Sequence, residues 1–488
     1  MNIIGRKREI AELNTLYHSG KSEFVAVYGR RRVGKTYLID ETLEGKITFR
    51  HAGLSPVEQE QARRGKQQQP RVLKLQLKHF YMSLLRHGMH RTHCPTSWIE
   101  AFYMLSQLLE SLQTEERQVV FLDELPWMDT PRSGFITAFE GFWNTWGCHR
   151  RNLMLVVCGS ATSWIQNNLI DGHGGLYGRV TRLIKLHPFS LHECEEFYRS
   201  RGIRLSRYDI TQCYMVLGGI PYYMNYVERG LSVAQIVDSL FFGSDARLQG
   251  EYDRLFASVF SKPDEMKRIV ETLHKRHGGW TRTEIVQKTG IPNNGLLGNM
   301  LKALTESGFA ECYTPFGLNK RDTLYKLTDP FCWFWLHFVK NRTRLPADFW
   351  KGNATQSIVS WRGIAFEEIC WCHWREIKQA LHIAGITTEL SSWTQRGDAD
   401  SEGAQIDLLI QRGDNVVNMC EMKFYNEPFT VSKTYHQKLL HRQNLIEAKI
   451  GRRKVVHPTL VTTEGLRENE YSHIFQSVIT LDDLFAPA

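Results

Sequence analysis

The chain has 488 residues, of which 42% are hydrophobic and 23% are charged, and its formal net charge is +9. This length and composition predict a globular protein of two to four packed domains and exclude an intrinsically disordered one. Because no run of about 18 apolar residues occurs and the start M-N-I-I-G-R-K-R-E lacks the apolar core of a signal peptide, we expect a cytoplasmic protein without a membrane partner.

The first functional pattern is V-Y-G-R-R-R-V-G-K-T-Y-L at positions 27–38. Gly29 and Gly34 bracket four residues and precede Lys35 and Thr36, which is the spacing of a phosphate-binding loop. Glycine allows backbone N–H groups to point at one anion, while the lysine can reach the β- and γ-phosphates of ATP and the threonine can hold Mg²⁺. The residues expected to bind ATP are Gly29, Arg30, Arg31, Arg32, Val33, Gly34, Lys35, Thr36 and Tyr37, although the three arginines can equally meet DNA or solvent.

The flanks of this loop support that interpretation. Residues 23–28 read as a short buried strand, and residues 36–43 read as a helix whose positive end would face the phosphates.

A basic segment follows at residues 61–91, with eight lysines and arginines and no acidic residue. Residues 72–85 can form a helix, whereas Q-Q-Q-P at 67–70 is typical of a loop. The segment is either an electrostatic footprint for a nucleic acid or a solvated insertion, and the sequence leaves both open.

A second nucleotide element stands at 118–124, where the apolar strand Q-V-V-F-L ends in two carboxylates. Asp123 would complete the Mg²⁺ shell and Glu124 would polarise the attacking water, because phosphoryl transfer needs a metal clamp and a positioned nucleophile. A further strand at 153–158 precedes Ser160, a candidate sensor of the γ-phosphate, since ligands bind at the carboxyl ends of parallel strands.

The stretch L-Y-G-R-V-T-R at 176–182 contains two candidate arginine fingers. Arg179 or Arg182 could stabilise transition-state charge, and the alternative is that both are helix-surface arginines. A finger that acts in trans would require a homo-oligomer.

Together these motifs resemble the archaeal-type ATPase family, which belongs to the STAND branch of AAA-like ATPases. The resemblance covers about residues 1–260 and rests on I-I-G-R-K-R-E-I-A-E-L, G-R-R-R-V-G-K-T, F-L-D-E-L-P-W, C-G-S-A-T-S-W, L-Y-G-R and L-G-G-I-P-Y-Y. It implies a P-loop ATPase core at 1–190, with Gly5 and Arg6 near the adenine, and a helical lid at 191–262 that contains the corner 218–221.

Residues 263–330 read as three helices and a β-hairpin, which is winged-helix order. DNA binding is one interpretation of this domain and a protein-binding module is the other. Residues 331–354 are expected to be a linker, with the aromatic run at 331–339 forming a core helix. The expected contacts to DNA are Asn293, Asn294, Asn299 and Lys302 on the third helix and Lys320 and Arg321 on the wing.

The final domain, 355–488, carries two apolar strands within 405–424 that are joined by the turn Q-R-G-D-N. A hairpin centred there brings Asp407 close to Glu421 and Lys423, which share one face of their strand. Two carboxylates can hold a divalent metal and the ammonium can orient a water against a phosphodiester. Glu367, on an expected helix, would supply a third carboxylate to the metal.

This order of an acid on a helix, Asp on a strand and E-x-K on the next strand resembles the PD-(D/E)xK nuclease fold. The domain of unknown function that follows archaeal-type ATPases, called DUF234, is similar to that group. The resemblance implies an α/β multidomain protein that ends in a restriction-endonuclease-like domain and uses Mg²⁺ or Mn²⁺ there.

Two functions remain open from the sequence. In the first, nucleotide state controls DNA binding and metal-dependent DNA cleavage, with Glu124, Ser160, Arg179, Glu421 and Lys423 as catalytic residues. In the second, slow ATP hydrolysis sets a switch for DNA or a protein partner, and the last domain is a catalytically silent platform. ATP binding is common to both.

Overall fold

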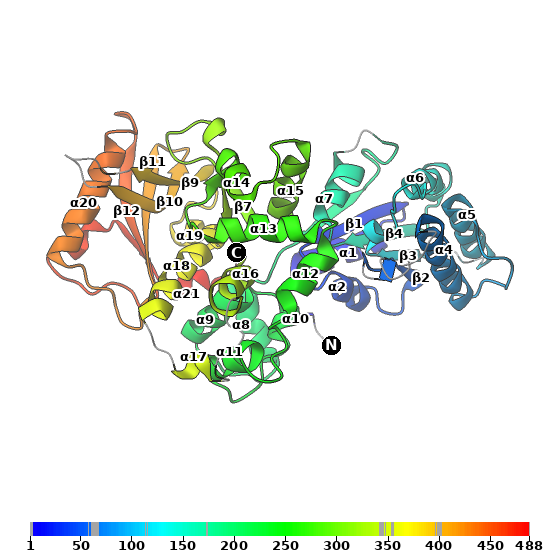
Figure 1. Ribbon diagram of the computed structural model, residues 1–488, viewed down its shortest axis with the longest axis horizontal. Coiled ribbons are helices and arrows are strands. Elements are labelled where there is room, and N and C mark those ends of the chain that lie inside the picture. Colours follow the sequence, from blue (N-terminus) through cyan, green and yellow to red (C-terminus); the bar gives the residue numbers. More distant parts are fainter. Residues whose placement is uncertain are drawn as a thin grey trace. The chain divides into compact units, whose positions relative to one another are not determined.

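The computed structural model describes residues 3–487 except 57, 60–67, 113, 115, 172–173, 341–345, 347, 353–355, 396 and 398–402. The chain forms two compact units (Figure 1). Unit 1 contains residues 1–188, 253–266 and 301–307, and unit 2 contains residues 189–252, 267–300 and 308–488. The segments expected to be the lid and the winged helix are therefore each divided between the two units.

Unit 1 is built on a five-stranded sheet in the order β2-β3-β4-β1-β5, and all of its strand pairs are parallel. The α/β class expected from the sequence is thereby confirmed. Strands β1, β3 and β4 correspond to the three predicted strands, whereas β2 and β5 were not predicted. The strands are β1 (Glu23–Gly29), β2 (Ile47–Ala52), β3 (Gln118–Asp123), β4 (Leu153–Gly159) and β5 (Arg182–Leu186).

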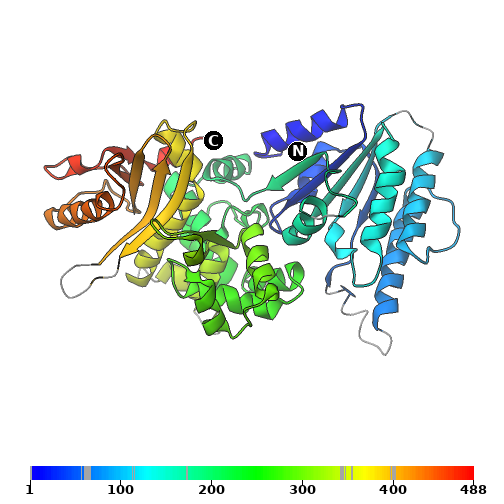
Figure 2. The ribbon, with the colours of Figure 1, turned by 90° about the horizontal axis from the view of Figure 1, so that it is seen from above.

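Helices cover both faces of this sheet. Helices α4, α5 and α6 lie on one face (Figure 2). Apolar side chains of the strands and of these helices form one large core cluster that includes Phe24, Phe102 and Phe139. In the described part of residues 1–188, the helices and turns are α1 (Lys7–Tyr17), α2 (Lys35–Thr42), α4 (Gln68–Arg86), α5 (Trp98–Ser111), η1 (Leu125–Trp127), α6 (Phe135–Thr145), η2 (Gly147–His149), α7 (Thr162–Ile165) and the π-helix η3 (Gln166–Ile170).

The second half of the basic segment belongs to this core. Leu77, Phe80 and Leu84 of α4 are buried against the sheet and α5, so this part of the segment is an integral layer of the domain. Arg63, Arg64 and Lys66 lie outside the described residues, and the two interpretations of that stretch stay predictions.

The helices after residue 188 include the elements expected for a lid and a winged helix. Three short strands form an antiparallel sheet in the order β6-β8-β7. The elements are α8 (Leu191–Ser200), α9 (Arg207–Leu217), α10 (Pro221–Met224), α11 (Val233–Phe241), α12 (Glu251–Val259), α13 (Pro263–His274), β6 (Trp280–Thr281), α14 (Arg282–Thr289), α15 (Gly295–Glu306), β7 (Ala310–Tyr313), η4 (Lys320–Asp322) and β8 (Leu324–Leu327).

The aromatic run at 331–339 is buried, as expected for a core element. Phe331 and Phe334 have no exposed surface, and the run folds as one α-helical turn followed by a π-helix. These elements are α16 (Pro330–Phe334) and η5 (Trp335–Val339), followed by α17 (Phe349–Gly352).

The C-terminal part of unit 2 contains a second five-stranded sheet, in the order β13-β12-β11-β10-β9. Strand β10 is antiparallel to both of its neighbours, β9 and β11, whereas β12 is parallel to both of its neighbours, β11 and β13. The elements are α18 (Gln356–Cys372), α19 (Trp374–Ala380), β9 (Thr388–Gln395), β10 (Ala404–Arg412), β11 (Val416–Lys423), α20 (Lys433–Glu447), β12 (Val455–Thr462), η6 (Ser472–Ile474), β13 (Ser477–Ile479) and α21 (Leu481–Leu484).

Within the described ranges, no helix combines the length and the apolar composition that crossing a membrane requires.

Gly29 is needed for both its conformation and its lack of a side chain. Its φ is +140°, and a Cβ atom there would overlap the carbonyl oxygen of Leu186 on β5. Gly20 also has positive φ (+66°), but its Cβ would meet open space. We expect Gly29→Ala to lower the free energy of unfolding by more than about 3 kcal/mol, because strain and overlap add. Gly20→Ala, the control, should cost only about 1 kcal/mol. Chemical denaturation measures both, and equal losses would contradict the overlap.

Candidate functional site

The phosphate loop connects β1 to α2. Gly29 ends the strand, and Gly34 (φ +92°) precedes the first helical residue, Lys35. This geometry places the amino terminus of α2 at the loop, where the unpaired N–H groups and the helix dipole favour an anion. The predicted strand, loop and helix thus occur in the expected order.

The side chain of Lys35 is buried, with 5% of the residue exposed. Its ammonium donates to the carbonyl oxygens of Gly29 and Arg30 and to Ser160 Oγ, each at 3.0 Å. Burial lowers the pKa of Lys35, and the nearby carboxylates of Glu124 and Asp123 oppose that shift. The positive charge is therefore held by polar groups that converge at the ends of β1, β3 and β4.

Thr36 and Asp123 meet at the same edge of the sheet. Thr36 Oγ1 donates to Asp123 Oδ2 at 2.9 Å, so an oxygen pair from α2 and β3 is already assembled. Burial raises the pKa of Asp123, while hydrogen bonds from Cys158 and Thr36 counteract the shift. A hydroxyl and a carboxylate are the ligands that Mg²⁺ prefers, so this donor set fits the expected ion.

Glu124 is positioned by backbone conformation and by Ser160. Its φ of 47° turns the chain sharply after β3. Its carboxylate accepts from the Ser160 backbone N–H at 2.9 Å and from Ser160 Oγ at 2.6 Å. Ser160 thereby connects Lys35 to Glu124, a link that the sequence did not predict.

The other predicted loop residues take different positions. Arg30 is buried, the guanidinium carbon of Arg31 lies 5.2 Å from the centre of the Trp127 ring, and Tyr37 is 46% exposed. Arg32 has a φ of 73°, and Val33 is buried. The described contacts thus hold part of the loop against its own domain.

Arg6, which the resemblance places near the adenine, is tied to the loop. Its Nη2 donates to the carbonyl oxygens of Val33 at 3.3 Å and of His187 at 2.6 Å. Arg6 therefore connects the start of the chain to the loop and to the segment after β5.

The two candidate arginine fingers differ in their surroundings. Arg182 Nε donates to Glu12 Oε2 at 2.9 Å, so this guanidinium is paired within its own unit. Arg179 is exposed.

Several residues of the predicted reading helix have structural partners. Asn294 Oδ1 accepts from the N–H groups of Leu296 and Leu297 at the start of α15, and Asn293 Oδ1 accepts from Arg282. Within unit 1, Lys302 Nζ lies 3.2 Å from Asp171 Oδ2. All six residues of the predicted set are exposed.

The C-terminal hairpin has the expected register. Leu408 on β10 pairs with Cys420 on β11, so the preceding Asp407 and the following Glu421 are neighbours across the two strands. Glu367 reaches them from α18, as predicted for a third carboxylate. Burial and the negative charge of Asp407 raise the pKa of Glu367 to about 8, and the charges of Lys423 and Glu421 also act on it.

Glu421 is surrounded by donors. Its Oε1 lies 2.6 Å from Lys423 Nζ and accepts from the hydroxyl of Tyr435, and its Oε2 accepts from Arg442 Nη1 at 2.7 Å. Burial disfavours the charge on Lys423, but Glu421 outweighs it and raises the pKa of Lys423. Arg442 and Tyr435, both from α20, were not predicted, because nothing in the local pattern marks them.

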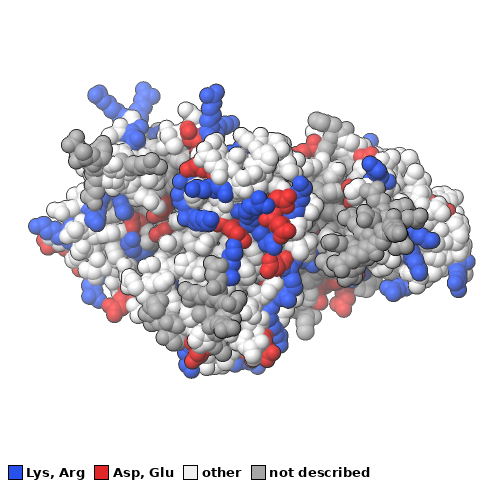
Figure 3. All heavy atoms as spheres, viewed as in Figure 1, with Lys and Arg blue, Asp and Glu red and all other residues white. Residues whose placement is uncertain are grey.

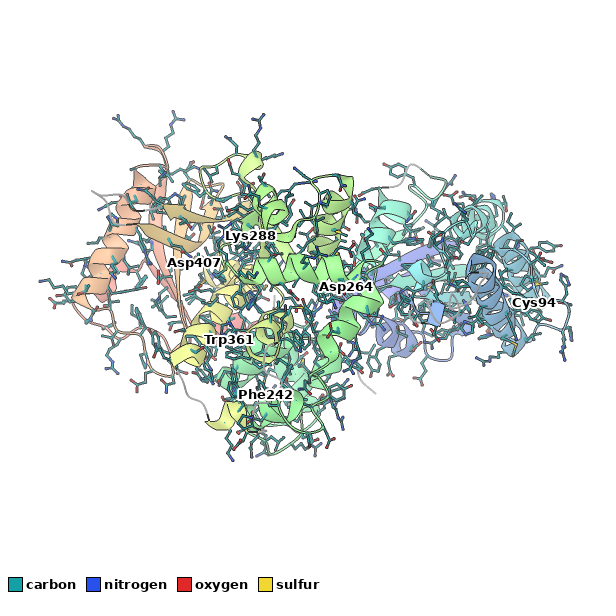
Figure 4. The ribbon with its side chains drawn as sticks, in the orientation of Figure 1. Cys94, Phe242, Asp264, Lys288, Trp361 and Asp407 are labelled. Atoms are coloured by element: carbon teal, nitrogen blue, oxygen red, sulfur yellow. The ribbon has the colours of Figure 1, made fainter. Side chains whose placement is uncertain are left out.

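His277 is a further unpredicted neighbour of this site. One ligand atom from each of His277, Glu367 and Asp407 lies within 4.8 Å of the others. Figure 4 shows Asp407 beside helix α18. The histidine comes from the segment between α13 and β6, about 90 residues before Glu367, so only the fold brings it here.

Comparison with known proteins identifies the first part of the chain. Residues 3–227 match a family described as an ATPase domain predominantly from Archaea. An uncharacterised protein of Methanocaldococcus jannaschii is 22% identical over 450 residues, which covers 91% of this chain and 92% of the relative. An uncharacterised ATP-binding protein of the same organism is 44% identical over 43 residues, or 9% of this chain and 73% of the relative.

Two solved structures match the chain at low similarity. The Walker-type ATPase of Pyrococcus abyssi is 18% identical, with a TM-score of 0.44, over 69% of this chain and 96% of that one. The ORC2 protein of Aeropyrum pernix, solved in ADPNP–ADP complexes, is 14% identical, with a TM-score of 0.40, over 76% of this chain and 95% of that one.

The family match covers the loop, the strand that ends in Asp123 and Glu124, and Ser160. Through residues 3–227, the chain therefore belongs to the family of ATPase domains found predominantly in Archaea, and its unit 1 is a nucleotide-binding ATPase domain.

Proposed function

We propose that the ATPase domain couples its nucleotide state to DNA binding and to metal-dependent DNA cleavage by the C-terminal domain. The observation that carries the nucleotide part is the hydrogen-bonded series from Lys35 through Ser160 to Glu124. Hydrogen bonds thus link Lys35, the proposed phosphate ligand, through Ser160, the proposed sensor, to Glu124, the proposed base. Because the three side chains form one network, a displacement of one of them alters the hydrogen bonds of the others.

Each residue then has a role in ATP hydrolysis. Lys35 would contact the β- and γ-phosphates, and Glu124 would orient and polarise the attacking water. Thr36 and Asp123 would hold Mg²⁺, which neutralises phosphate charge when bound. Arg179, exposed and on the same unit, would supply charge to a second copy of the chain in a homo-oligomer.

The DNA-binding part rests on local basic clusters. Figure 3 shows lysine and arginine side chains interspersed with acidic ones on the face drawn, so the net charge of +9 does not gather into one broad patch there. Lys320 and Arg321 are exposed after β7, and Arg452, Arg453 and Lys454 are consecutive and exposed before β12. Such clusters suit contacts to phosphate, which position DNA without reading its sequence.

The cleavage part rests on the convergence of Glu367, Asp407, Glu421 and Lys423. The carboxylates would hold Mg²⁺ or Mn²⁺, which polarises a phosphodiester when bound. Because Lys423 keeps its proton beside Glu421, it would stabilise phosphate charge and orient water instead of accepting a proton.

A specific observation favours the alternative of a catalytically silent platform. Both carboxylate oxygens of Glu421 already face cations, Lys423 and Arg442, and the Tyr435 hydroxyl adds a third donor. A carboxylate neutralised in this way is a weaker metal ligand. Under this alternative, the protein is a nucleotide-controlled switch for DNA or a protein partner.

The ATPase roles predict a separation between binding and hydrolysis. Lys35→Ala should abolish ATP binding, whereas Glu124→Gln should keep binding and lower kcat by about 10²- to 10³-fold, because only the water is affected. Phosphate release and fluorescent-nucleotide binding measure the two. Lys7→Ala, an exposed lysine of the same unit, is the control and should match wild type. Wild-type hydrolysis by Glu124→Gln would remove Glu124 from the mechanism.

The cleavage proposal predicts that Asp407→Asn abolishes strand breaks in supercoiled or linear DNA with Mg²⁺ or Mn²⁺ while ATP hydrolysis continues. The matched control is Asp414→Asn in the exposed turn of the same hairpin, where Asp414 pairs with Arg412. Gel analysis of the DNA is the readout. If wild type leaves every DNA topology intact, cleavage is excluded and the switch remains.

Coupling predicts that DNA affinity depends on the nucleotide. Fluorescence anisotropy with ATP, ADP or no nucleotide should give different dissociation constants for DNA. In the double variant Lys320→Ala, Arg321→Ala, the slope of log K against log salt concentration should become shallower by about two units, because about two phosphate contacts are lost. Identical affinities in all three nucleotide states would contradict both the nuclease coupling and the switch.

A further inference from the structure

The cluster of His277, Glu367 and Asp407 joins three separate segments of unit 2. The ligand atoms lie within 4.8 Å of one another, and each residue is partly exposed, so an ion from solvent can reach them. One nitrogen and two carboxylate oxygens at this spacing can share a single divalent cation.

The orientation of His277 suits a metal ligand. Its Nε2 lies 2.7 Å from Glu368 Oε1, and its Nδ1 lies 3.8 Å from Glu367 Oε2. Nε2 therefore lies on the side of Glu368, and Nδ1 lies on the side of Glu367 in the cluster. Metal-binding histidines in proteins usually have a carboxylate beside their second ring nitrogen, which helps to fix the orientation of the ring.

Glu368 is itself held in place. It is 4% exposed, and Lys326 Nζ lies 3.1 Å from the oxygen that faces His277. Lys326 is also buried and lies 3.7 Å from the centre of the Trp371 ring. The support behind the imidazole is thus a packed, charge-balanced network, which a purely superficial ion pair would not require.

Among the described residues, fewer hydrogen-bond donors and cations lie at the carboxylates of Glu367 and Asp407 than at Glu421. Asp407 Oδ1 accepts from the Gln405 side chain at 2.6 Å. Glu421 has cations at both oxygens. Because Glu421 already faces two cations, His277 is better placed than Glu421 to be the third ligand of a metal ion bound by Glu367 and Asp407.

We propose that His277, Glu367 and Asp407 bind one divalent transition-metal ion, with His277 Nδ1 as the nitrogen ligand and Glu368 as its positioning residue. This deepens the proposed cleavage function and rests on its assignment of Glu367 and Asp407 to a metal. A nitrogen ligand favours Mn²⁺ and later first-row ions over Mg²⁺, which prefers oxygen. The ion would also connect the segment between α13 and β6 to the C-terminal sheet.

The test uses full-length protein, without nucleotide or DNA, titrated with Mn²⁺. Electron paramagnetic resonance counts bound Mn²⁺, and pulsed measurements detect nitrogen coupling from a ligating imidazole. Wild type should bind one tight Mn²⁺ with nitrogen coupling and should retain it in excess Mg²⁺. His277→Ala should weaken binding roughly tenfold or more and lose the nitrogen signal, and Glu368→Gln should weaken it less.

Controls keep folding and ligation separate. His90→Ala, an exposed histidine of unit 1, should bind Mn²⁺ as wild type does. His277→Gln keeps a polar side chain, so if it retains the wild-type thermal transition but loses the nitrogen signal, ligation and not folding was removed. Nitrogen coupling that persists in folded His277→Gln, or equal Mn²⁺ affinity in wild type and both His277 variants, would overturn the proposal.

The outcomes distinguish this proposal from the cleavage function. Mn²⁺ binding that depends on His277, without cleavage of any DNA, would support the metal site and exclude the nuclease. Cleavage with Mg²⁺ that is lost in Asp407→Asn but unchanged in His277→Ala would support the nuclease and overturn the role of His277.

Discussion

The buried ammonium of Lys35 is the constraint on which the ATPase domain depends. A charge removed from water must be compensated by polar groups, and here the compensation comes from two loop carbonyls, the Ser160 hydroxyl and the nearby carboxylates. These groups lie at the ends of adjacent parallel strands, so the order β3-β4-β1 in the centre of the sheet is what brings them together. The same edge is where the phosphates of a nucleotide would bind.

In the C-terminal domain, the charges that must be compensated are negative. Its hairpin and helix α18 bring several carboxylates close together, and partly buried negative charges are stable only near cations or protons. The structure divides them into two groups. Lys423 and Arg442 neutralise Glu421, whereas Glu367 and Asp407 face His277. The carboxylates that the sequence pattern assigns to one metal site therefore lie in two different electrostatic environments in the fold.

The two units differ in how their functional groups are assembled. In unit 1, the candidate functional residues come from the loop between β1 and α2 and from the carboxyl ends of the parallel strands β3 and β4. In unit 2, they come from a loop after α13, from α18, from the hairpin and from α20. A site built from distant segments changes whenever one of those segments moves, which is the physical property that a regulated site needs.

The sequence by itself determined the phosphate loop, the strand that ends in Asp123 and Glu124, Ser160, and the hairpin of Asp407, Glu421 and Lys423. These depend on spacing within a few residues, where glycine conformation and strand alternation leave little freedom. Only the tertiary structure decided that Ser160 forms hydrogen bonds with both Lys35 and Glu124. It also decided that Arg442 and Tyr435 donate hydrogen bonds to Glu421. The position of His277 beside Glu367 and Asp407 likewise comes from the fold. Those contacts link residues far apart in the chain, and their partners are set by strand order and packing, which no local pattern encodes.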